Sequence, residues 1–362
     1  MDMDQIARAR MNRRRLVGTS LAIPALAVLP LSVRRALAQD KISVTMVTDT
    51  AGLGDQNFND LADSAGKKAA ADFGITWKVI ESQNAADYVP NLTAAAEQSG
   101  LSIGVGYLLT DAIAAVATQF SDNKFLLIDS VVEPTNVRSV TFKEQEGAFL
   151  AGVAAALTTK TNKLGVVGGE KIPPVIRYQV GFQAGVKSIN EDAEVTVSYV
   201  NSFDDVQLGK ELALAQFNQG ADIVFPVAGR SGIGGYEAVK EKGQGFWVIG
   251  ADVDQDHLAP GFQLCVSRKG VDTAVYDTIK SVVDDEFAGG PANLGIKEGY
   301  ISLQTPGNRV DSETLALAGG YQKAIVEGTI VVPTTEDELA SFQVPPQPSP
   351  VPVASPEGTP TS

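Results

Sequence analysis

Short β-branched runs alternate with longer helical stretches from residue 42 onward, and this alternation constrains the fold more than any other feature of the sequence. In the first half, strands are predicted at residues 42–47, 77–80, 102–105 and 125–128, and helices at 58–72, at 88–98 and from 111. Strands that alternate with helices form a parallel sheet covered by helices on both faces. The first half is therefore predicted to be a doubly wound α/β unit.

The same alternation starts again at residue 164, after an alanine-rich helix predicted over 145–160. Strands are predicted at 164–167, 195–200, 223–227 and 246–249, and helices at 175–189, 206–218 and 233–242. Two such halves, in a chain of 362 residues, predict two α/β lobes. Ligands bind at the carboxyl ends of strands in such sheets, so two facing lobes would enclose a cleft lined by strand-end loops.

The lobes are not predicted to be continuous in sequence. A late strand over 264–267 and a helix over 271–285 could return to the first lobe. We therefore assign residues 39–145 and 265–297 to the N-terminal lobe, and residues 146–264 and 298–342 to the C-terminal lobe. Residues 343–362 contain seven prolines and are predicted to be an extended, disordered tail.

The N-terminus has the parts of an export signal. Three arginines at 13–15 precede the apolar run 16–33, and Ala-Leu-Ala at 36–38 fits a cleavage site. The basic start predicts a signal of the twin-arginine type over residues 1–38. An uncleaved membrane anchor is the alternative, because 18 mostly apolar residues nearly span a bilayer. Two prolines inside the run argue against that anchor.

Composition excludes several classes of function. The formal net charge is −14, and the predicted leader holds seven arginines and two aspartates, so the remaining chain carries −19. Such a chain repels nucleic acids. With one cysteine (Cys265) and one histidine (His257), no intramolecular disulfide and no zinc site of the Cys/His kind can form. No G-x-S-x-G motif accompanies His257, so we predict no catalytic residues, no metal and no cofactor.

The loop after the first predicted strand allows two interpretations. It runs from Asp49 to Asn59 and brings carboxylates, amides and the ring of Phe58 to the start of a helix. In one interpretation Asp55 or Asn57 caps the helix and Phe58 packs in the core. In the other, these groups converge on a planar polar ligand.

Two further strand ends carry glycines or acids. Residues 229–235 are glycine-rich, and Asp252 follows about 20 residues later. This combination imitates the dinucleotide-binding fingerprint of a nicotinamide-dependent enzyme, although the spacing of the glycines is not G-x-G-x-x-G. The alternative is a close turn whose N–H groups can bind a ligand.

The acids 252, 254 and 256 do not form an EF-hand loop, because His257 stands where glycine is required. Asp252 is better suited to accept hydrogen bonds from ligand hydroxyls. Lys269, also at a strand end, is of interest if the lobe boundary lies there.

Taken together, residues 42–330 resemble the basic membrane protein family, the purine nucleoside receptors of ABC transporters. The resemblance lies in the order and spacing of seven segments. These are residues 48–59, 104–107, 125–129, 144–152, 221–225, 228–229 and 250–255. It implies the type I periplasmic-binding-protein fold, in which three crossovers join two α/β lobes around a ligand cleft.

The resemblance also implies roles for individual residues. Phe58 and Phe203 would stack on the two faces of a purine. Asn59 and Asp129 would bind the edge of the base, with Asp49 beside it. The ribose hydroxyls would be held by Gly229, Asp252 and Lys269.

The sequence departs from the family pattern at a few positions. Asn57 stands where serine is common, Ala51 where glycine is, and Arg230 where a small residue is. Arg230 could therefore reach into or over the cleft. No cysteine lies at the predicted cleavage site, so we do not expect a lipoprotein.

The function implied is that of an exported, extracytoplasmic and monomeric protein that captures a nucleoside, with a purine nucleoside favoured, and delivers it to an ABC permease. It makes and breaks no bond in the ligand. One alternative is a binding protein of the same fold for a sugar, an autoinducer or a purine derivative. Others are an extracytoplasmic nucleoside-processing enzyme and a repressor-like regulator, for which a DNA-binding headpiece would have to replace the predicted leader.

Overall fold

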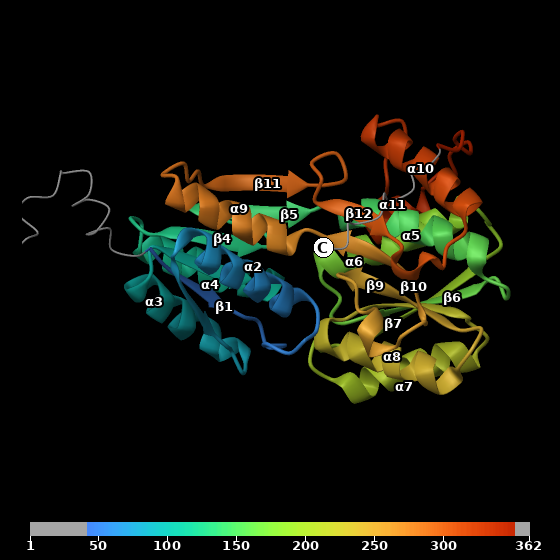
Figure 1. Ribbon diagram of the computed structural model, residues 1–362, viewed down its shortest axis with the longest axis horizontal. Helices are drawn as coiled ribbons and strands as arrows, with labels where there is room; N and C mark the ends of the chain where they lie inside the picture. Colours follow the sequence, from blue (N-terminus) through green and yellow to red (C-terminus); the bar gives the residue numbers. More distant parts are fainter. Residues whose placement is uncertain (1–41, 352–362) are drawn as a thin grey trace, which may run out of the picture. The chain divides into compact units, whose positions relative to one another are not determined.

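The computed structural model describes residues 42–351, and the predicted leader over 1–38 lies outside them. Two six-stranded sheets form the core of this part of the chain (Figure 1). The first sheet has the order β11-β5-β4-β3-β1-β2, with every neighbouring pair parallel. Its strands are β1 (Ser43–Val47), β2 (Thr76–Ile80), β3 (Leu101–Val105), β4 (Lys124–Ile128), β5 (Val137–Phe142) and β11 (Gly290–Leu294).

Helices cover both faces of the first sheet because its strands are apolar on both sides. Met46 and Leu126 belong to the apolar cluster that includes residues of α2 and α9. Their chain neighbours Val47 and Leu127 point the other way, into a cluster with α3 and α4. The helices are α2 (Phe58–Phe73), α3 (Tyr88–Gln98), α4 (Thr110–Gln119) and α9 (Val271–Val283).

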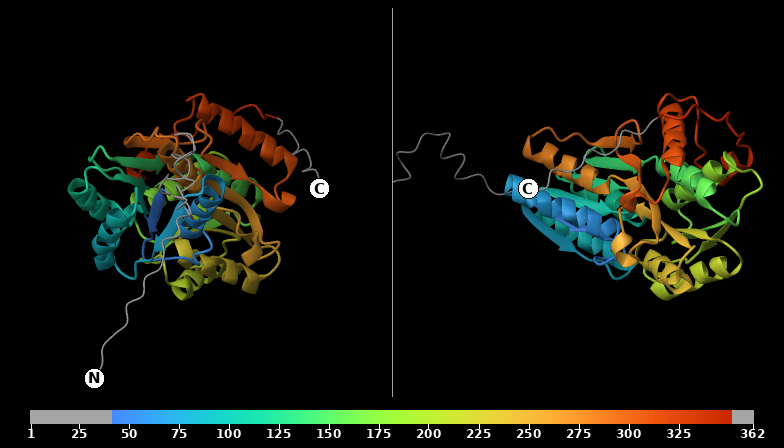
Figure 2. Two further views of the ribbon diagram at one scale, coloured as in Figure 1. Left: turned by 60° about the vertical axis from the view of Figure 1, so that its left-hand side comes forward. Right: turned by 45° about the vertical axis from the view of Figure 1, so that its right-hand side comes forward.

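The second sheet repeats this arrangement in the order β12-β10-β9-β8-β6-β7, with only the β10–β12 pair antiparallel. Its strands are β6 (Lys163–Gly168), β7 (Glu194–Tyr199), β8 (Ile223–Val227), β9 (Trp247–Asp252), β10 (Gln263–Lys269) and β12 (Ile301–Gln304). Val166 packs in the cluster of α5 and α6, and its neighbour Val167 packs with α7 and α8. These helices are α5 (Glu144–Thr158), α6 (Pro173–Lys187), α7 (Val206–Asn218) and α8 (Ile233–Lys242). Figure 2 shows the same layers from two other directions.

The chain passes between the two lobes three times. It leaves the first lobe between β5 and α5, returns between β10 and α9, and leaves again between β11 and β12. The two-lobed α/β architecture predicted from the alternation is therefore confirmed. The predicted return at residue 265 is wrong by one strand, because β10 pairs with β9 and β12 of the second sheet. The sequence of a buried apolar strand does not show which sheet the strand joins. In the structure, the chain returns to the first lobe at Gly270.

Two further helices, α10 (Ser312–Val326) and α11 (Glu336–Ala340), precede the proline-rich segment. That segment follows a defined extended path over residues 343–351, where the N–H of Val351 donates to the carbonyl of Ala316 on α10 (2.8 Å). A disordered tail is therefore the wrong description of 343–351, while residues 352–362 lie outside the part described. Among the helices in residues 42–351, none is both long and apolar enough to cross a membrane.

Candidate functional site

A cavity of about 560 Å³, counted with its mouth, opens between strand-end loops of the two lobes. All eight residues that the sequence predicted as ligand contacts line it. They are Asp49, Phe58, Asn59, Asp129, Phe203, Gly229, Asp252 and Lys269. The structure therefore brings together side chains that lie up to 220 positions apart in the sequence.

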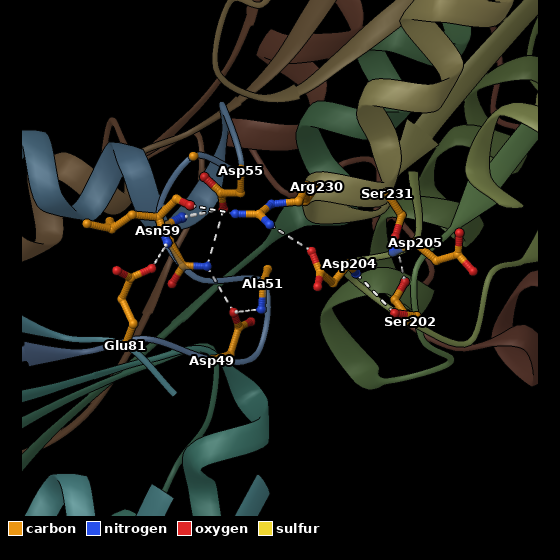
Figure 3. Close-up of polar contacts among 12 residues, drawn as sticks. Asp49, Ala51, Asp55, Asn59, Glu81, Ser202, Asp204, Asp205, Arg230 and Ser231 are labelled. Carbon is orange, nitrogen blue, oxygen red and sulfur yellow. Dashed lines mark hydrogen bonds and ion pairs between the residues drawn. The ribbon is translucent and has the colours of Figure 1, made fainter. Parts of the chain in front are cut away.

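The loop between β1 and α2 places Asp49 and Asn59 in the cavity (Figure 3). Asp55 caps the helix, since its carboxylate accepts from the backbone N–H groups of Asn57, Asn59 and Asp60 at 2.7–3.1 Å. The Asn59 amide donates to Asp49 Oδ1 (2.9 Å), and Asn59 Oδ1 is buried without a hydrogen-bond partner. Burial raises the pKa of Asp49 to about 7. Asp55 therefore caps the helix, as the first interpretation predicted, while Asp49, Phe58 and Asn59 line the cavity.

One aromatic ring enters the cavity from each lobe. Phe58 is the first residue of α2, and Phe203 lies in the loop after β7. A glycine leaves room for the Phe203 ring, because a Cβ on Gly169 would lie only 2.4 Å from that ring. Gly106 borders the Phe58 ring and needs glycine for its backbone, which has φ +116°. The two rings offer flat apolar faces from opposite lobes.

A buried ion cluster lies beside Phe58. Lys269, 2% exposed, has its Nζ 2.7 Å from Asp129 Oδ2, 3.1 Å from Glu144 Oε1 and 5.0 Å from the centre of the Phe58 ring. Burial raises the pKa of Asp129 to about 6, against the opposing effect of Lys269. Burial lowers the pKa of Lys269, but the carboxylates of Asp129, Glu144 and Asp252 outweigh it and hold that pKa above its usual range. Asp129 Oδ1 remains buried and without a partner.

Asp252 faces the cavity from the end of β9. It accepts a hydrogen bond from the Tyr178 hydroxyl at 2.6 Å, and burial raises the pKa of the Asp252 carboxyl. Asp254 and Asp256 turn elsewhere, to Gln263 and Arg309. The three alternating acids therefore bond to three different partners. Across residues 42–351, no group of three His, Cys, Asp or Glu side chains is placed to hold a metal ion.

The glycine-rich segment after β8 forms a tight turn (Gly229–Gly232) that leads into α8. A Cβ on Gly234 would lie 2.3 Å from the backbone of Lys210 on α7. This glycine is therefore used for close helix packing. Gly229 itself, with φ +53°, lines the cavity.

The two residues that composition singled out lie outside the cavity lining. Cys265 is fully buried in β10, and burial raises the pKa of its thiol to about 12. His257 is exposed, with Nε2 3.1 Å from Gln56 Oε1 of the other lobe. The burial of Cys265 and the surface position of His257 keep both side chains out of the cavity lining.

Sequence reasoning missed three residues of the site. Glu144 and Arg177 extend the ion cluster, with Arg177 Nε 2.6 Å from Glu144 Oε2, and Tyr178 supports Asp252. Glu144 stood inside a recognised segment and could have been found there. Arg177 and Tyr178 lie within a predicted helix, and nothing in the sequence distinguished them from residues that only pack or face solvent.

The family to which the chain belongs follows from comparison with known proteins. Residues 42–336 match the model of the Bmp family, ABC transporter substrate-binding proteins that are PnrA-like. A Listeria monocytogenes protein named CD4+ T-cell-stimulating antigen is 35% identical over 313 residues, which is 80% of this chain and 88% of that protein. The Lactococcus lactis ABC transporter nucleoside-binding protein BmpA is 33% identical over 356 residues, covering 90% of this chain and all of that protein.

Solved structures agree with this relationship. An ABC transporter solute-binding protein from Aeropyrum pernix superposes with a TM-score of 0.77 at 30% identity, over 83% of this chain and 96% of that one. A solute-binding protein from Conexibacter woesei, at 22% identity and a TM-score of 0.66 over 81% of this chain and 99% of that one, shares the fold. The fold is the two-lobed type I periplasmic-binding-protein fold, and the chain belongs to the Bmp family of ABC transporter substrate-binding proteins.

Proposed function

We propose that this protein captures a nucleoside, with purine nucleosides favoured, in the cavity between its lobes and delivers it to the permease of an ABC importer. The observation that carries the proposal is the pair Phe58 and Phe203, one from each lobe, in a cavity that also holds unpaired buried acceptors. Stacking between two rings suits a flat base and is tolerant of base identity. A relative at 33% identity carries the name nucleoside-binding protein.

Polar groups around the rings supply selectivity for the base. The free Oδ1 atoms of Asn59 and Asp129 are buried and can accept hydrogen bonds from the N–H groups of a base. A ligand without those donors would leave both acceptors unsatisfied, which costs about 1–3 kcal/mol for each. Asp49 lies within hydrogen-bond distance of the Asn59 amide and orients it.

The ribose would face the second lobe and the ion cluster. Asp252 is fixed by Tyr178, and its carboxylate can accept from a pair of sugar hydroxyls. Lys269 can donate to the same hydroxyls, and the backbone of Gly229 approaches closely because no side chain intervenes. Closure of the lobes over the ligand would present one compact surface to the permease.

We further propose that the protein acts outside the cytoplasm without changing its ligand. The leader over residues 1–38 would direct export, and no cysteine at the predicted cleavage site is available for lipid attachment. The one histidine of the sequence lies outside the cavity lining, which favours binding over hydrolysis.

Isothermal titration calorimetry against adenosine, guanosine, inosine, cytidine and ribose tests the proposal. We expect purine nucleosides to bind with Kd below about 100 μM and to raise the melting temperature. No nucleoside binding, together with a melting temperature that no nucleoside changes, would reject it. Binding of ribose alone would favour a sugar-binding protein, and release of free base from nucleoside would reveal an enzyme.

Two substitutions test the site itself. Phe58→Ala removes a stacking face, and Asp129→Ala removes a base acceptor, so each should weaken purine binding roughly 10-fold or more. Lys78→Ala, at an exposed position on β2, is the control. Circular dichroism establishes that each variant is folded. Unchanged affinity in both site variants would refute the assignment of these residues.

A further inference from the structure

Arg230 joins the two lobes at the edge of the cavity. It follows Gly229 in the second lobe, and its Nη2 donates to the carbonyl of Leu53 in the first lobe at 2.6 Å. Its Nη1 lies 3.0 Å from Asp204 Oδ1, within its own lobe. Figure 3 shows the guanidinium between the loop that carries Asp55 and the loop that carries Asp204. The side chain is about one third exposed, so the contact is partly shielded from water.

The acceptors on both sides are held in place by other bonds. The N–H of Leu53 donates to Glu81 Oε2 (2.9 Å), and the N–H of Gly54 donates to Asp60 Oδ1 (2.8 Å). In the second lobe, the N–H of Asp204 donates to the hydroxyl of Ser202 (3.0 Å). A planar guanidinium with donors in a fixed fork therefore meets two fixed acceptors, an arrangement that lysine cannot reproduce.

The same first-lobe loop is held at a second point. Gln255 Nε2 donates to the carbonyl of Gln56 (3.0 Å), and His257 Nε2 lies 3.1 Å from Gln56 Oε1. Both points belong to the loop that continues into Phe58 and Asn59. Opening the lobes must break the contacts at both points before a ligand between Phe58 and Phe203 can leave.

We propose that Arg230 is a positioning residue that clasps the Leu53–Gln56 loop to the second lobe and sets the rate at which ligand leaves the closed protein. The effect on ligand release rests on the proposed function, whereas the clasp itself holds the lobes together with or without a bound nucleoside. Arg230 makes its cross-lobe bond only when the lobes are together, so its loss affects opening more than first encounter.

Surface plasmon resonance with adenosine, guanosine and inosine on the immobilised protein measures this directly. Arg230→Ala should raise the dissociation rate roughly 10-fold, as expected for one lost charged hydrogen bond, with the association rate within about 3-fold of wild type. Arg230→Lys should fall between the two. Lys240→Ala removes the same charge from an exposed position on α8 and should match wild type. Nucleoside binding with an unchanged dissociation rate in Arg230→Ala would overturn the clasp and leave the proposed function standing.

The distance between the two lobes tests the clasp without any ligand. The native cysteine is buried, so spin labels attach selectively to Ala71→Cys on α2 and Ala215→Cys on α7, both exposed positions. By pulsed electron paramagnetic resonance, Arg230→Ala without nucleoside should shift the distance distribution toward longer values than in the labelled parent. If both proteins give the same distribution, the clasp is refuted. If the shift appears while no nucleoside binds either protein, the clasp stands and the proposed function fails.

Discussion

Lys269 is a buried cation that lies among three carboxylates, and its Nζ is within 3.1 Å of two of them. It is also the last residue of β10, directly before the crossover at Gly270. Glu144 begins α5, directly after the first crossover. The ion pair between Lys269 and Glu144 therefore ties together two of the three segments on which the lobes are joined.

Replacing this lysine should destabilise the protein strongly. Lys269→Met keeps the length of the side chain but leaves the buried carboxylate of Asp129 without a cation, which costs about 3–5 kcal/mol. Urea unfolding measures the free energy. The double variant Lys269→Met, Asp129→Asn removes that unpaired charge and should recover part of the loss. A double variant no more stable than the single one would contradict this account.

Asp49 should make stability depend on pH. Its pKa in the folded protein is raised to about 7, so the folded state holds this proton more tightly than the unfolded state does. The contribution of Asp49 to stability is therefore present below about pH 4 and is lost as pH rises to about 7. Asp129, with a pKa raised to about 6, acts in the same direction.

The test compares urea unfolding of wild type and Asp49→Asn at pH 5 and pH 8. The asparagine can still accept from the Asn59 amide and carries no charge to bury. Going from pH 5 to pH 8, wild type should lose on the order of 1 kcal/mol or more relative to the variant. Parallel pH profiles for the two proteins would show that Asp49 is not ionising in this range.

At the level of single residues, the family resemblance predicted which side chains line the cavity, and for several of them strand-end position gives a local reason. Phe58, Asn59, Asp129 and Asp252 follow predicted strands, and the ends of parallel strands share one edge of a sheet. The pairing of Lys269 with Glu144 could not be predicted, because it depends on how two lobes dock. The contacts of Arg230 with both lobes could not be predicted for the same reason, because they too depend on how the lobes dock.

Among the elements, α10 and the proline-rich segment form an unexpected pair. A Cβ on Gly320 would lie 2.4 Å from the carbonyl oxygen of Ser349, and one on Gly319 would lie 3.1 Å from that of Val351. Two adjacent glycines in a helix cost stability through conformational entropy. Here they let an extended backbone lie directly against the helix.

Gly320→Ala should therefore have different effects on stability in two chains. In a chain that ends at Phe342, alanine should raise stability by up to about 1 kcal/mol, because it favours the helix and meets no tail. In the full chain the methyl group should push the segment away and cancel that gain. Melting temperatures of the four proteins give the comparison. An equal gain in both backgrounds would show that the segment does not lie on α10.

Most strands and helices inside the two alternating halves were predicted from their apolar runs, but β5 (Val137–Phe142) was not. The edge strand β11 (GPANL) was not, since its residues alternate between partly exposed and exposed and lack the β-branched run typical of a strand. The sheet to which β10 belongs was also mistaken. Edge and crossover strands depend on tertiary pairing rather than on their own sequence.

On the scale of the whole described chain, the two lobes share part of their apolar cores. One apolar cluster includes Met46 and Leu126 of the first sheet, Phe149 of α5 and Tyr321 of α10. The rings of Phe149 and Tyr321, both from the second lobe, lie 5.4 Å apart in this cluster. Local loss of this packing would affect both lobes.

Differential scanning calorimetry should accordingly show one unfolding transition rather than two. A nucleoside at about 100 times its Kd should stabilise the folded protein by about 2.7 kcal/mol and shift that single transition as a whole. Two resolved transitions, of which ligand moves only one, would mean that the lobes unfold independently.

Asp129 and Asp252 occupy the same place in the two sheets, after the third strand in each order, and both have left-handed backbones (φ +74° and +63°). The cavity thus has an approximate two-fold symmetry, with one aspartate presented by each half. The symmetry is broken by their partners, a lysine ammonium at Asp129 and a tyrosine hydroxyl at Asp252. A ligand with two chemically different ends would meet a charge-neutralised carboxylate on one side and a hydrogen-bonded one on the other. We propose that these neighbours decide the orientation of the ligand, so that exchanging their chemistry would favour a ligand bound in the reverse direction.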